Sequence, residues 1–185
     1  MNHQHDQVQC VDEHNTPTNV MDKLEAHRGD GKRHRAVSVF LLNSTGELLI
    51  QKRSAKKIVG ALQWANTCCG NVWPGETYEQ CAQRRLRKEL GITRAKIMPA
   101  YTFEYHLRCN DKYSEWEMDR IFVGRYRGKL TLDPEEVLDA LYISQEKLEI
   151  NMRNNPEDFS PWFHLILRDP RLREAIGWRR DAKIQ

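Results

Sequence analysis

The chain has 185 residues, of which 39% are hydrophobic, enough apolar material for one sizeable core but little for two. We therefore expect a single domain spanning residues 1–185. The 29 lysines and arginines nearly balance the 26 aspartates and glutamates, and the formal net charge of +3 is too small to favour nucleic acid as a partner.

The chain's first ten residues and its cysteines indicate the compartment. Residues 1–10, MNHQHDQVQC, are polar, which predicts a flexible tail rather than a secretory leader. No later segment is long and apolar enough to suggest a membrane span, so we expect a soluble, cytoplasmic protein. The five cysteines are odd in number and irregularly spaced, which favours free thiols in a reducing compartment over a disulfide framework.

The apolar pattern predicts strands first and a helix next. Residues 37–43 and 47–52 are rich in aliphatic side chains and flank Ser44-Thr45-Gly46, which is typical of a hairpin. Residues 77–90 place apolar side chains close to helical spacing and end at Gly91, which predicts the clearest helix of the chain.

The rest of the chain mixes strands with helices. We expect strands at 100–107 and 120–126, a short acidic turn or helix at 134–140, and helices at 146–154 and 162–167. This order of elements predicts an α/β (α+β) fold in which helices cover a mixed sheet.

The segment from Gly70 to Ile92 carries the most specific motif. It resembles the Nudix box, a loop, helix and loop with the pattern G-x5-E-x7-R-E-U-x-E-E-x-G-U, where U is a large aliphatic residue. The matching residues are Gly70, Glu76, Arg84, Leu86, Glu89, Gly91 and Ile92. The resemblance implies a Nudix-type mixed sheet sandwiched between helices, with carboxylates on one helix face that hold a divalent cation against a diphosphate.

Two carboxylates of the box are replaced by the cations Arg85 and Lys88. Pyrophosphohydrolases of the family bind several metal ions to polarise water, whereas Glu89 alone can hold at most one Mg²⁺. The replacements therefore count against a hydrolase. The plain alternative is an ordinary amphipathic helix whose charged side chains form solvated i to i+4 pairs.

The altered box is similar to that of type I isopentenyl-diphosphate isomerases, and it reads Arg84-Arg85-Leu86-Arg87-Lys88-Glu89-Leu90-Gly91. The similarity extends from about residue 23 to about residue 162. It implies an enzyme of isoprenoid biosynthesis that interconverts isopentenyl and dimethylallyl diphosphate. It also implies catalytic roles for Cys69, Glu117, Tyr105 and Trp162, diphosphate binding by Lys23, Arg53, Lys57 and Arg85, and metal binding by His27, His34, Glu89, Glu115 and Glu117.

The implied reaction adds a proton at C4 of isopentenyl diphosphate and removes one at C2, so it needs two proton-transfer groups on opposite faces of the substrate. In the mechanism that the resemblance implies, Glu117 is the acid, Tyr105 is its hydrogen-bond helper, and Cys69 is the base as a thiolate. Trp162 would present its π face to the cationic charge at C3, a contact worth about 2 kcal/mol when desolvated.

The same resemblance implies two metal ions. One is Mg²⁺, held by Glu89 together with the diphosphate. The other is Mn²⁺, Zn²⁺ or Mg²⁺ at the histidines, Glu115 and Glu117, because carboxylates two residues apart in a strand point to one side and can reach one cation. The family has a third histidine where this chain has Asn71, and an amide oxygen is a weaker ligand than imidazole, which makes Asn71 a doubtful ligand. Cys68 offers an alternative thiolate.

Two other functions stay open at this point. One is a Nudix hydrolase of a nucleoside or prenyl diphosphate, against which Arg85 and Lys88 count. The other is a non-catalytic diphosphate-binding protein that lost a metal ligand at Asn71. Retention of Cys69 and Glu117 argues against it, because a binding protein needs neither. The oligomeric state does not follow from the sequence.

Overall fold

In the computed structural model, residues 7–178 are described, and their strands join in one mixed sheet. The strands are β1 (Gln7–Val11), β2 (Pro17–Asp22), β3 (His34–Leu42), β4 (Leu48–Arg53), β5 (Trp64–Ala65), β6 (Cys68–Asn71), β7 (Lys96–Arg108), β8 (Ser114–Arg125) and β9 (Val137–Ile143). The helices are α1 (Lys23–His27), α2 (Tyr78–Leu90), α3 (Gln145–Asn154), α4 (Pro161–Arg168) and α5 (Pro170–Ile176), with a 3₁₀ turn at Pro156–Asp158.

Strand β3 lies at the centre of the sheet. Its sequence, HRAVSVFLL, is nearly continuous in apolar residues and buried along its length, as expected of a strand covered on both faces. It pairs in parallel with β8 and antiparallel with β6, and β8 pairs antiparallel with the long strand β7. Strands β4, β5 and β9 form the other half of the sheet, beyond a short contact between β3 and β4.

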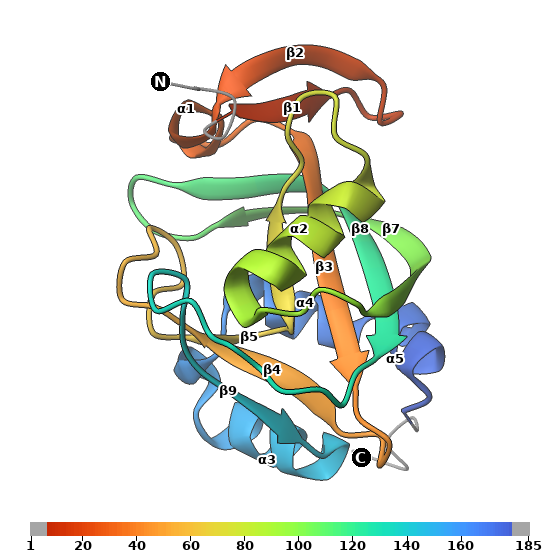
Figure 1. Cartoon of the computed structure of the whole chain (residues 1–185). Helices are drawn as coiled ribbons and strands as arrows, with labels where there is room; N and C mark the ends of the chain where they lie inside the picture. The colour runs from red at the N-terminus through yellow and green to blue at the C-terminus, as the bar shows by residue number, and fades with distance from the viewer. Residues whose placement is uncertain (1–6, 179–185) are drawn as a thin grey trace.

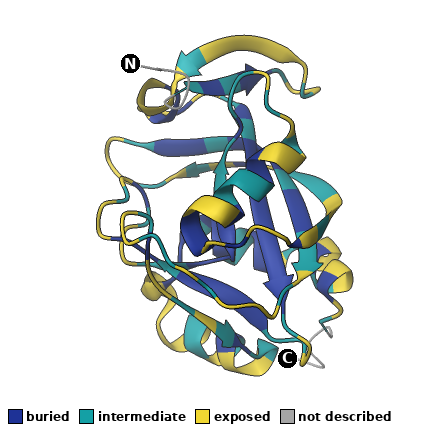
Figure 2. Ribbon diagram, viewed as in Figure 1, coloured by how far each residue is buried: buried dark blue, intermediate teal, exposed yellow. Residues whose placement is uncertain are grey.

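The core is divided into two layers by the sheet. Because neighbouring strand residues face opposite sides, Phe40 packs toward α4 and α5 whereas Val39 and Leu41 pack beneath α2. Figure 1 shows α2 in front of β3 with α4 behind it, and Figure 2 shows buried strands between these layers. The prediction of a mixed sheet sandwiched between helices is confirmed.

Helix α2 begins and ends where the sequence predicts. The side chain of Thr77 accepts a hydrogen bond from the Gln80 backbone, and the Gln80 side-chain oxygen accepts one from the Thr77 backbone, a capping box that contributes about 1 kcal/mol. Gly91 ends the helix in the left-handed conformation at a φ of 67°. The buried face of α2 carries Leu86 and, near its end, Glu89. The caps therefore fix which side chains of the box face the sheet.

The structure corrects two local predictions. Residues 7–10 belong to β1 rather than to a flexible tail, because Val8 and Cys10 are buried; residues 1–6 lie outside the described part of the chain. Residues 134–136 form the expected turn, but Val137–Ile143 is strand β9, which pairing with β4 stabilises.

The expected strands, hairpin and helices elsewhere are present, and the five cysteines are free thiols. Across residues 7–178, none of the helices has the length and apolar character needed to cross a membrane.

Candidate active site

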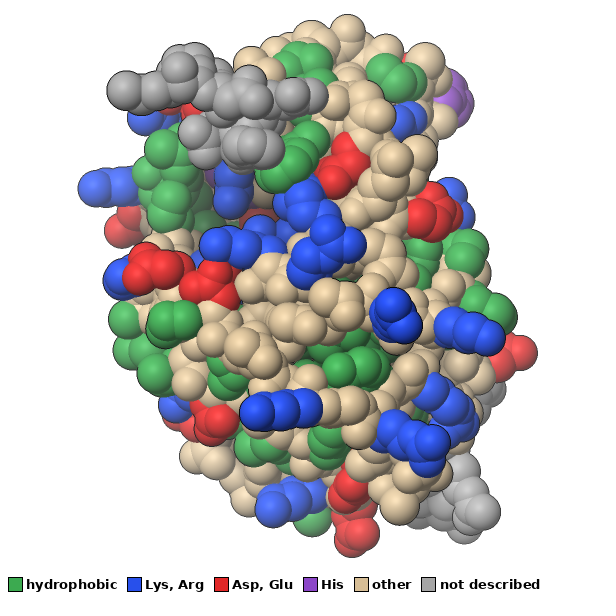
Figure 3. All heavy atoms as spheres, viewed as in Figure 1, with side chains coloured by type: hydrophobic (Ala, Val, Ile, Leu, Met, Phe, Trp, Pro, Cys, Tyr) green, Lys and Arg blue, Asp and Glu red, His purple; other side chains and the backbone are tan. Residues whose placement is uncertain are grey.

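A cavity of about 280 Å³ opens beside α1, between the β6 end of the sheet and the loops before β5 and β9. The predicted residues that line it are Lys23, His27, Arg53, Lys57, Cys69, Asn71, Arg85, Tyr105, Glu115, Glu117 and Trp162. His34 and Glu89 lie behind its wall and are bonded to lining residues. Figure 3 shows a hollow in this part of the surface, with lysines and arginines gathered around it and carboxylates beside them.

The two histidines are held in the form that binds metal. His27 ends α1, and its Nδ1 lies 2.6 Å from the carbonyl oxygen of Lys23; the Nδ1 of His34 lies 2.7 Å from that of Lys32. A carbonyl only accepts, so each Nδ1 carries a proton, and Nε2 is then the ligand atom of the neutral ring. Burial, reinforced by the neighbouring His34, lowers the pKa of His27 to about 4, which keeps its imidazole neutral.

The sheet register places the acidic residues beside these rings. Glu117 on β8 is the parallel partner of His34 on β3 and the antiparallel partner of Tyr105 on β7. The Tyr105 hydroxyl oxygen is 2.5 Å from Oε2 of Glu117 and 3.0 Å from Oε2 of Glu115. Both carboxylates lie on one side of β8, as the spacing predicts. Burial next to Glu117 raises the pKa of Glu115.

Three side chains form a group able to hold a cation. Donor atoms of His27, His34 and Glu117 all lie within 4.8 Å of one another, and the three residues are buried. Two imidazoles and a carboxylate suit a divalent ion, so the donor set fits the predicted metal. Asn71 touches the group through Nδ2, 3.0 Å from Nε2 of His34 and 3.1 Å from Oε1 of Glu117. Among the described residues, Glu115 lies outside this close group, so its role as a ligand stays a prediction.

The two cysteines of strand β6 face opposite sides of the sheet. Cys69 lines the cavity, whereas Cys68 is fully buried in the layer beneath α2, where burial raises the pKa of its thiol well above the usual value. The alternative of Cys68 as a metal ligand is therefore wrong: neighbouring strand residues face opposite sides of a sheet.

Cys69 is a thiol in this pocket. Its Sγ lies 3.6 Å from Nη1 of Arg53, which donates a hydrogen bond to it. Burial raises the pKa of Cys69 to about 12, although Arg53 acts in the opposite direction. The mechanism anticipated from the sequence starts from a thiolate, whereas burial favours the protonated form. Arg53 is the adjacent group that would stabilise the deprotonated form.

Arg85 reaches the cavity by crossing β6. A Cβ atom at Gly70 would lie 2.7 Å from Cδ of Arg85, so this box glycine leaves space for the arginine. Nε of Arg85 donates to Oε1 of Glu89 at 2.8 Å, and Nη2 donates to Oε2 of Glu136 at 3.0 Å. Lys57 also forms an ion pair with Glu136. Sequence reasoning missed Glu136, for which the acidic run 133–136 was the available signal.

Solved structures support the Nudix fold. The Deinococcus radiodurans protein DR0079 aligns with a TM-score of 0.72 at 21% identity, over 88% of this chain and 98% of that one. A MutT protein from Methanosarcina mazei aligns with a TM-score of 0.59 at 21% identity, over 77% of this chain and 95% of that one. At these identities the likeness concerns the fold alone.

Sequence comparisons decide the family. The NUDIX domain family matches residues 32–163. A protein of Pectobacterium atrosepticum named isopentenyl-diphosphate Delta-isomerase is 37% identical over 159 residues, covering 86% of this chain and 88% of its own length. One of the same name from Streptomyces coelicolor is 37% identical over 173 residues, covering 92% and 87%. This chain belongs to the isopentenyl-diphosphate Delta-isomerase family, within the Nudix family.

In this isomerase-family chain, both cations that replace box carboxylates have acidic partners on the loop before β9. Arg85 pairs with Glu136, and Lys88 pairs with Asp133 at 2.7 Å. Burial opposes the charge on Arg85, but Glu89 and Glu136 outweigh it and raise its pKa. Because the Glu89 side chain is only 1% exposed, the plain alternative of solvated pairs on α2 is wrong for this pair.

Trp162 closes the apolar side of the isomerase-family pocket. It lies on α4, is buried, and has the guanidinium carbon of Arg53 5.0 Å from its ring centroid. A Cβ atom at Gly60 would lie 2.8 Å from the Trp162 ring, so the preceding loop packs closely against it. The ring thus already stacks with one cation on one side.

Proposed function

We propose that this chain is an isopentenyl-diphosphate Delta-isomerase, which moves the double bond of isopentenyl diphosphate to give dimethylallyl diphosphate and catalyses the reverse reaction. The observation that carries the proposal is a single cavity lined by a thiol, a tyrosine-bonded carboxylate pair and a cluster of lysines and arginines. The names of the relatives point to the same reaction for those proteins.

Cys69 and Glu117 stand on strands that flank β3 on its two sides, so they can approach a substrate from different directions. The Glu117 carboxyl, held by Tyr105, adds its proton to C4, and positive charge develops at C3. The Cys69 thiolate then removes the proton from C2, and the electron pair of that bond forms the new double bond. The carboxyl gives one proton to C4 and the sulfur receives a different one from C2, so the substrate keeps its composition and the reaction balances.

The cations of the pocket suit the diphosphate. Lys23, Lys57 and Arg85 enter from α1, the loop after β4, and α2, so that they surround one end of the cavity. A guanidinium binds two phosphate oxygens at once, and lysines add point charges. Arg53 lies between this end and Cys69, and Trp162 packs beside it. The prenyl end of the substrate would then lie near the thiol and the ring.

His27, His34 and Glu117 would hold one divalent cation, and Glu89 would hold the Mg²⁺ that accompanies the diphosphate. When bound, such a cation supplies positive charge that strengthens a neighbouring carboxyl as an acid. The ion at the histidines would be Mn²⁺, Zn²⁺ or Mg²⁺, and Asn71 favours the harder ions among these three. A single domain over residues 1–185 and a cytoplasmic location also stay predictions.

Conversion of isopentenyl to dimethylallyl diphosphate tests the proposal, followed by NMR with the purified protein in Mg²⁺ alone and with added Mn²⁺ or Zn²⁺. Turnover is expected, with Cys69→Ala inactive and Cys10→Ala, on β1, active as the matched control. Release of phosphate without isomerisation would instead favour the hydrolase. Binding without any turnover would favour the non-catalytic protein.

A further inference from the structure

The diphosphate end of the pocket contains more positive charge than its carboxylates neutralise. Four cations, Lys23, Arg53, Lys57 and Arg85, line this end, and two carboxylates are bonded to Lys57 and Arg85. These carboxylates are Glu89 and Glu136. The net charge of this group is therefore two positive, less than the three negative charges of a fully ionised prenyl diphosphate.

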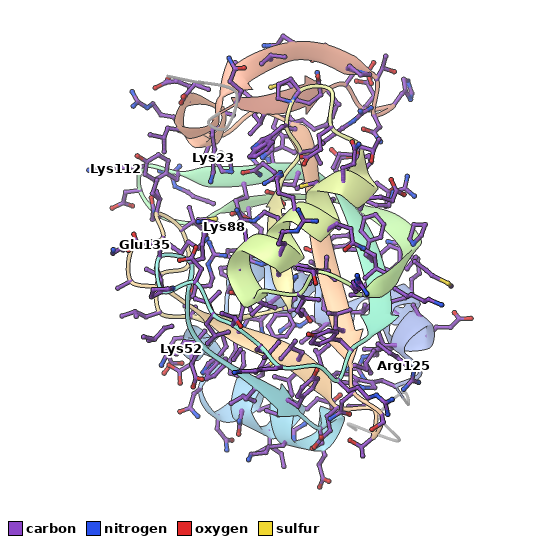
Figure 4. All side chains as sticks on the ribbon, in the orientation of Figure 1. Lys23, Lys52, Lys88, Lys112, Arg125 and Glu135 are labelled. Carbon is purple, nitrogen blue, oxygen red and sulfur yellow. The ribbon has the colours of Figure 1, made fainter. Side chains whose placement is uncertain are left out.

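Glu136 occupies a distinctive place among these groups. Its carboxylate lines the cavity, is 18% exposed, and bonds to both Lys57 and Arg85, the cations expected to bind phosphate oxygens. Glu135 also lines the cavity but is its contrast, since it pairs with Lys56, away from Lys57 and Arg85, and both of those side chains are more than 60% exposed. In Figure 4, the side chain of Lys23, the first residue of α1, lies below that helix. Glu135 lies lower, on the loop that also carries Glu136.

Glu136 is ionised at neutral pH. Burial would raise the pKa of its carboxyl, but Arg85 and Lys57 outweigh burial and lower the pKa to about 2. An incoming diphosphate must therefore take Lys57 and Arg85 from a charged carboxylate, which then remains beside the bound phosphate oxygens. Two anions held this close repel each other unless a cation accompanies them.

We propose that Glu136 shifts the preference of this pocket toward the magnesium complex of a diphosphate, because its carboxylate repels the free diphosphate anion more strongly. The inference rests on the proposed function, because it assumes that the diphosphate binds at these cations. A diphosphate that carries Mg²⁺ has only one net negative charge, so it meets little repulsion from Glu136. The free anion has three, so the Glu136 carboxylate repels it more strongly.

A purely structural Glu136 would behave differently. If it only held Lys57 and Arg85 in position, its loss would weaken the free anion and the magnesium complex to a similar extent. The ratio of the dissociation constant of the free anion to that of the magnesium complex separates these roles. A change in charge alters this ratio, whereas a loss of positioning leaves it unchanged.

The experiment is calorimetric titration with inorganic diphosphate, once with EDTA and once with saturating Mg²⁺. In the wild type, Mg²⁺ is expected to strengthen binding. In Glu136→Gln, the affinity for the metal-free anion should rise relative to that for the magnesium complex, so the ratio falls about tenfold, as expected for one charge at contact distance in a partly exposed site. Glu136→Asp keeps the charge and should keep the ratio, and Glu135→Gln is the matched control in the same loop.

Each outcome has a defined meaning. An unchanged ratio in a folded Glu136→Gln protein, or an equal fall in Glu135→Gln, would overturn the inference and leave the proposed function standing. A wild type that fails to bind diphosphate even with Mg²⁺ would overturn both. If Glu136→Gln does not fold, Glu136→Ala, which also removes the charge, makes the same test with the same sign: the ratio should fall, and an unchanged ratio would overturn the inference.

Discussion

The two ends of the pocket are built differently. At the metal-ligand end, His27, His34 and Glu117 are buried, and backbone carbonyls hold both imidazoles in one tautomer. At the diphosphate end, Lys57 and Arg85 are bonded to carboxylates that a ligand has to replace. Proton transfer needs side chains that are held in place before the substrate arrives. Binding of a charged substrate instead needs cations that can release their carboxylate partners and bind the substrate in their place.

The largest effect on turnover is expected at the metal-ligand end. Glu117→Gln keeps the shape of the side chain but removes the acid, so turnover should fall roughly a thousandfold, within the range of general acid–base catalysis. Tyr105 would lose a carboxylate partner but remain buried, and the thermal midpoint should change little. The check is the rate of dimethylallyl diphosphate formation by NMR. Glu104→Gln, an exposed carboxylate on β7, is the control; equal losses in both variants would contradict the assignment.

Arg85→Gln perturbs the diphosphate end of the pocket. It removes a bidentate phosphate contact and leaves Glu89 buried without its cation, so kcat/KM should fall about a hundredfold. The thermal midpoint should fall as well, because an unpaired buried carboxylate is costly. Steady-state kinetics and thermal unfolding measure the two effects. Arg87→Gln, on the exposed face of α2, should leave both near wild type, and a similar loss there would remove the special role of Arg85.

The ion pairs of the diphosphate end should make the free energy of unfolding depend on pH. The pKa of Glu136 is lowered from 4.5 to about 2 in the folded state, so the unfolded state binds more protons between these values. The free energy of unfolding contributed by Glu136 is thus present above pH 4.5 and disappears as the pH falls to about 2. At about 1.4 kcal/mol per pKa unit, its size is about 3 kcal/mol.

Urea denaturation across this pH range measures that contribution. The slope of stability against pH should be shallower in Glu136→Gln than in the wild type. Glu135→Gln, whose ion pair is exposed, should keep the slope of the wild type. An identical slope in all three proteins would show that Glu136 is not held as an ion.

The smallest effect concerns the ligand set. Asn71→His adds an imidazole next to His34 and Glu117, so affinity for Zn²⁺ or Mn²⁺ should rise about tenfold or more. Competition titration against a metal indicator measures it, without need of turnover. Asn110→His, on the loop between β7 and β8, controls for an added surface imidazole. An unchanged affinity in Asn71→His would place residue 71 outside the coordination sphere.

Much of the scaffold could be predicted from the sequence because its signals are local. The cap at Thr77 and the stop at Gly91 bound α2, and the spacing of Glu115 and Glu117 already places both carboxylates on one side of a strand. The Nudix-type sandwich and the isomerase family were also predicted from these motifs, and the comparisons confirm both.

The rest depended on contacts between distant residues. Val137–Ile143 carries weak strand signals and is held as β9 by pairing with β4, while residues 7–10 become a strand through burial of Val8 and Cys10. The protonation of Cys69 follows from burial in the cavity, which the residue type alone does not reveal.

The sequence by itself determined the candidate side chains for the chemistry, since Cys69, Glu117 and the altered box are read from residue type and spacing. Only the tertiary structure decided which charges meet. Glu136 reaches Arg85 across 51 residues of chain, and Lys57 reaches Glu136 across 79. The physical reason is that helix and strand periodicities act over a few residues, whereas ion pairs depend on which loops the sheet brings together.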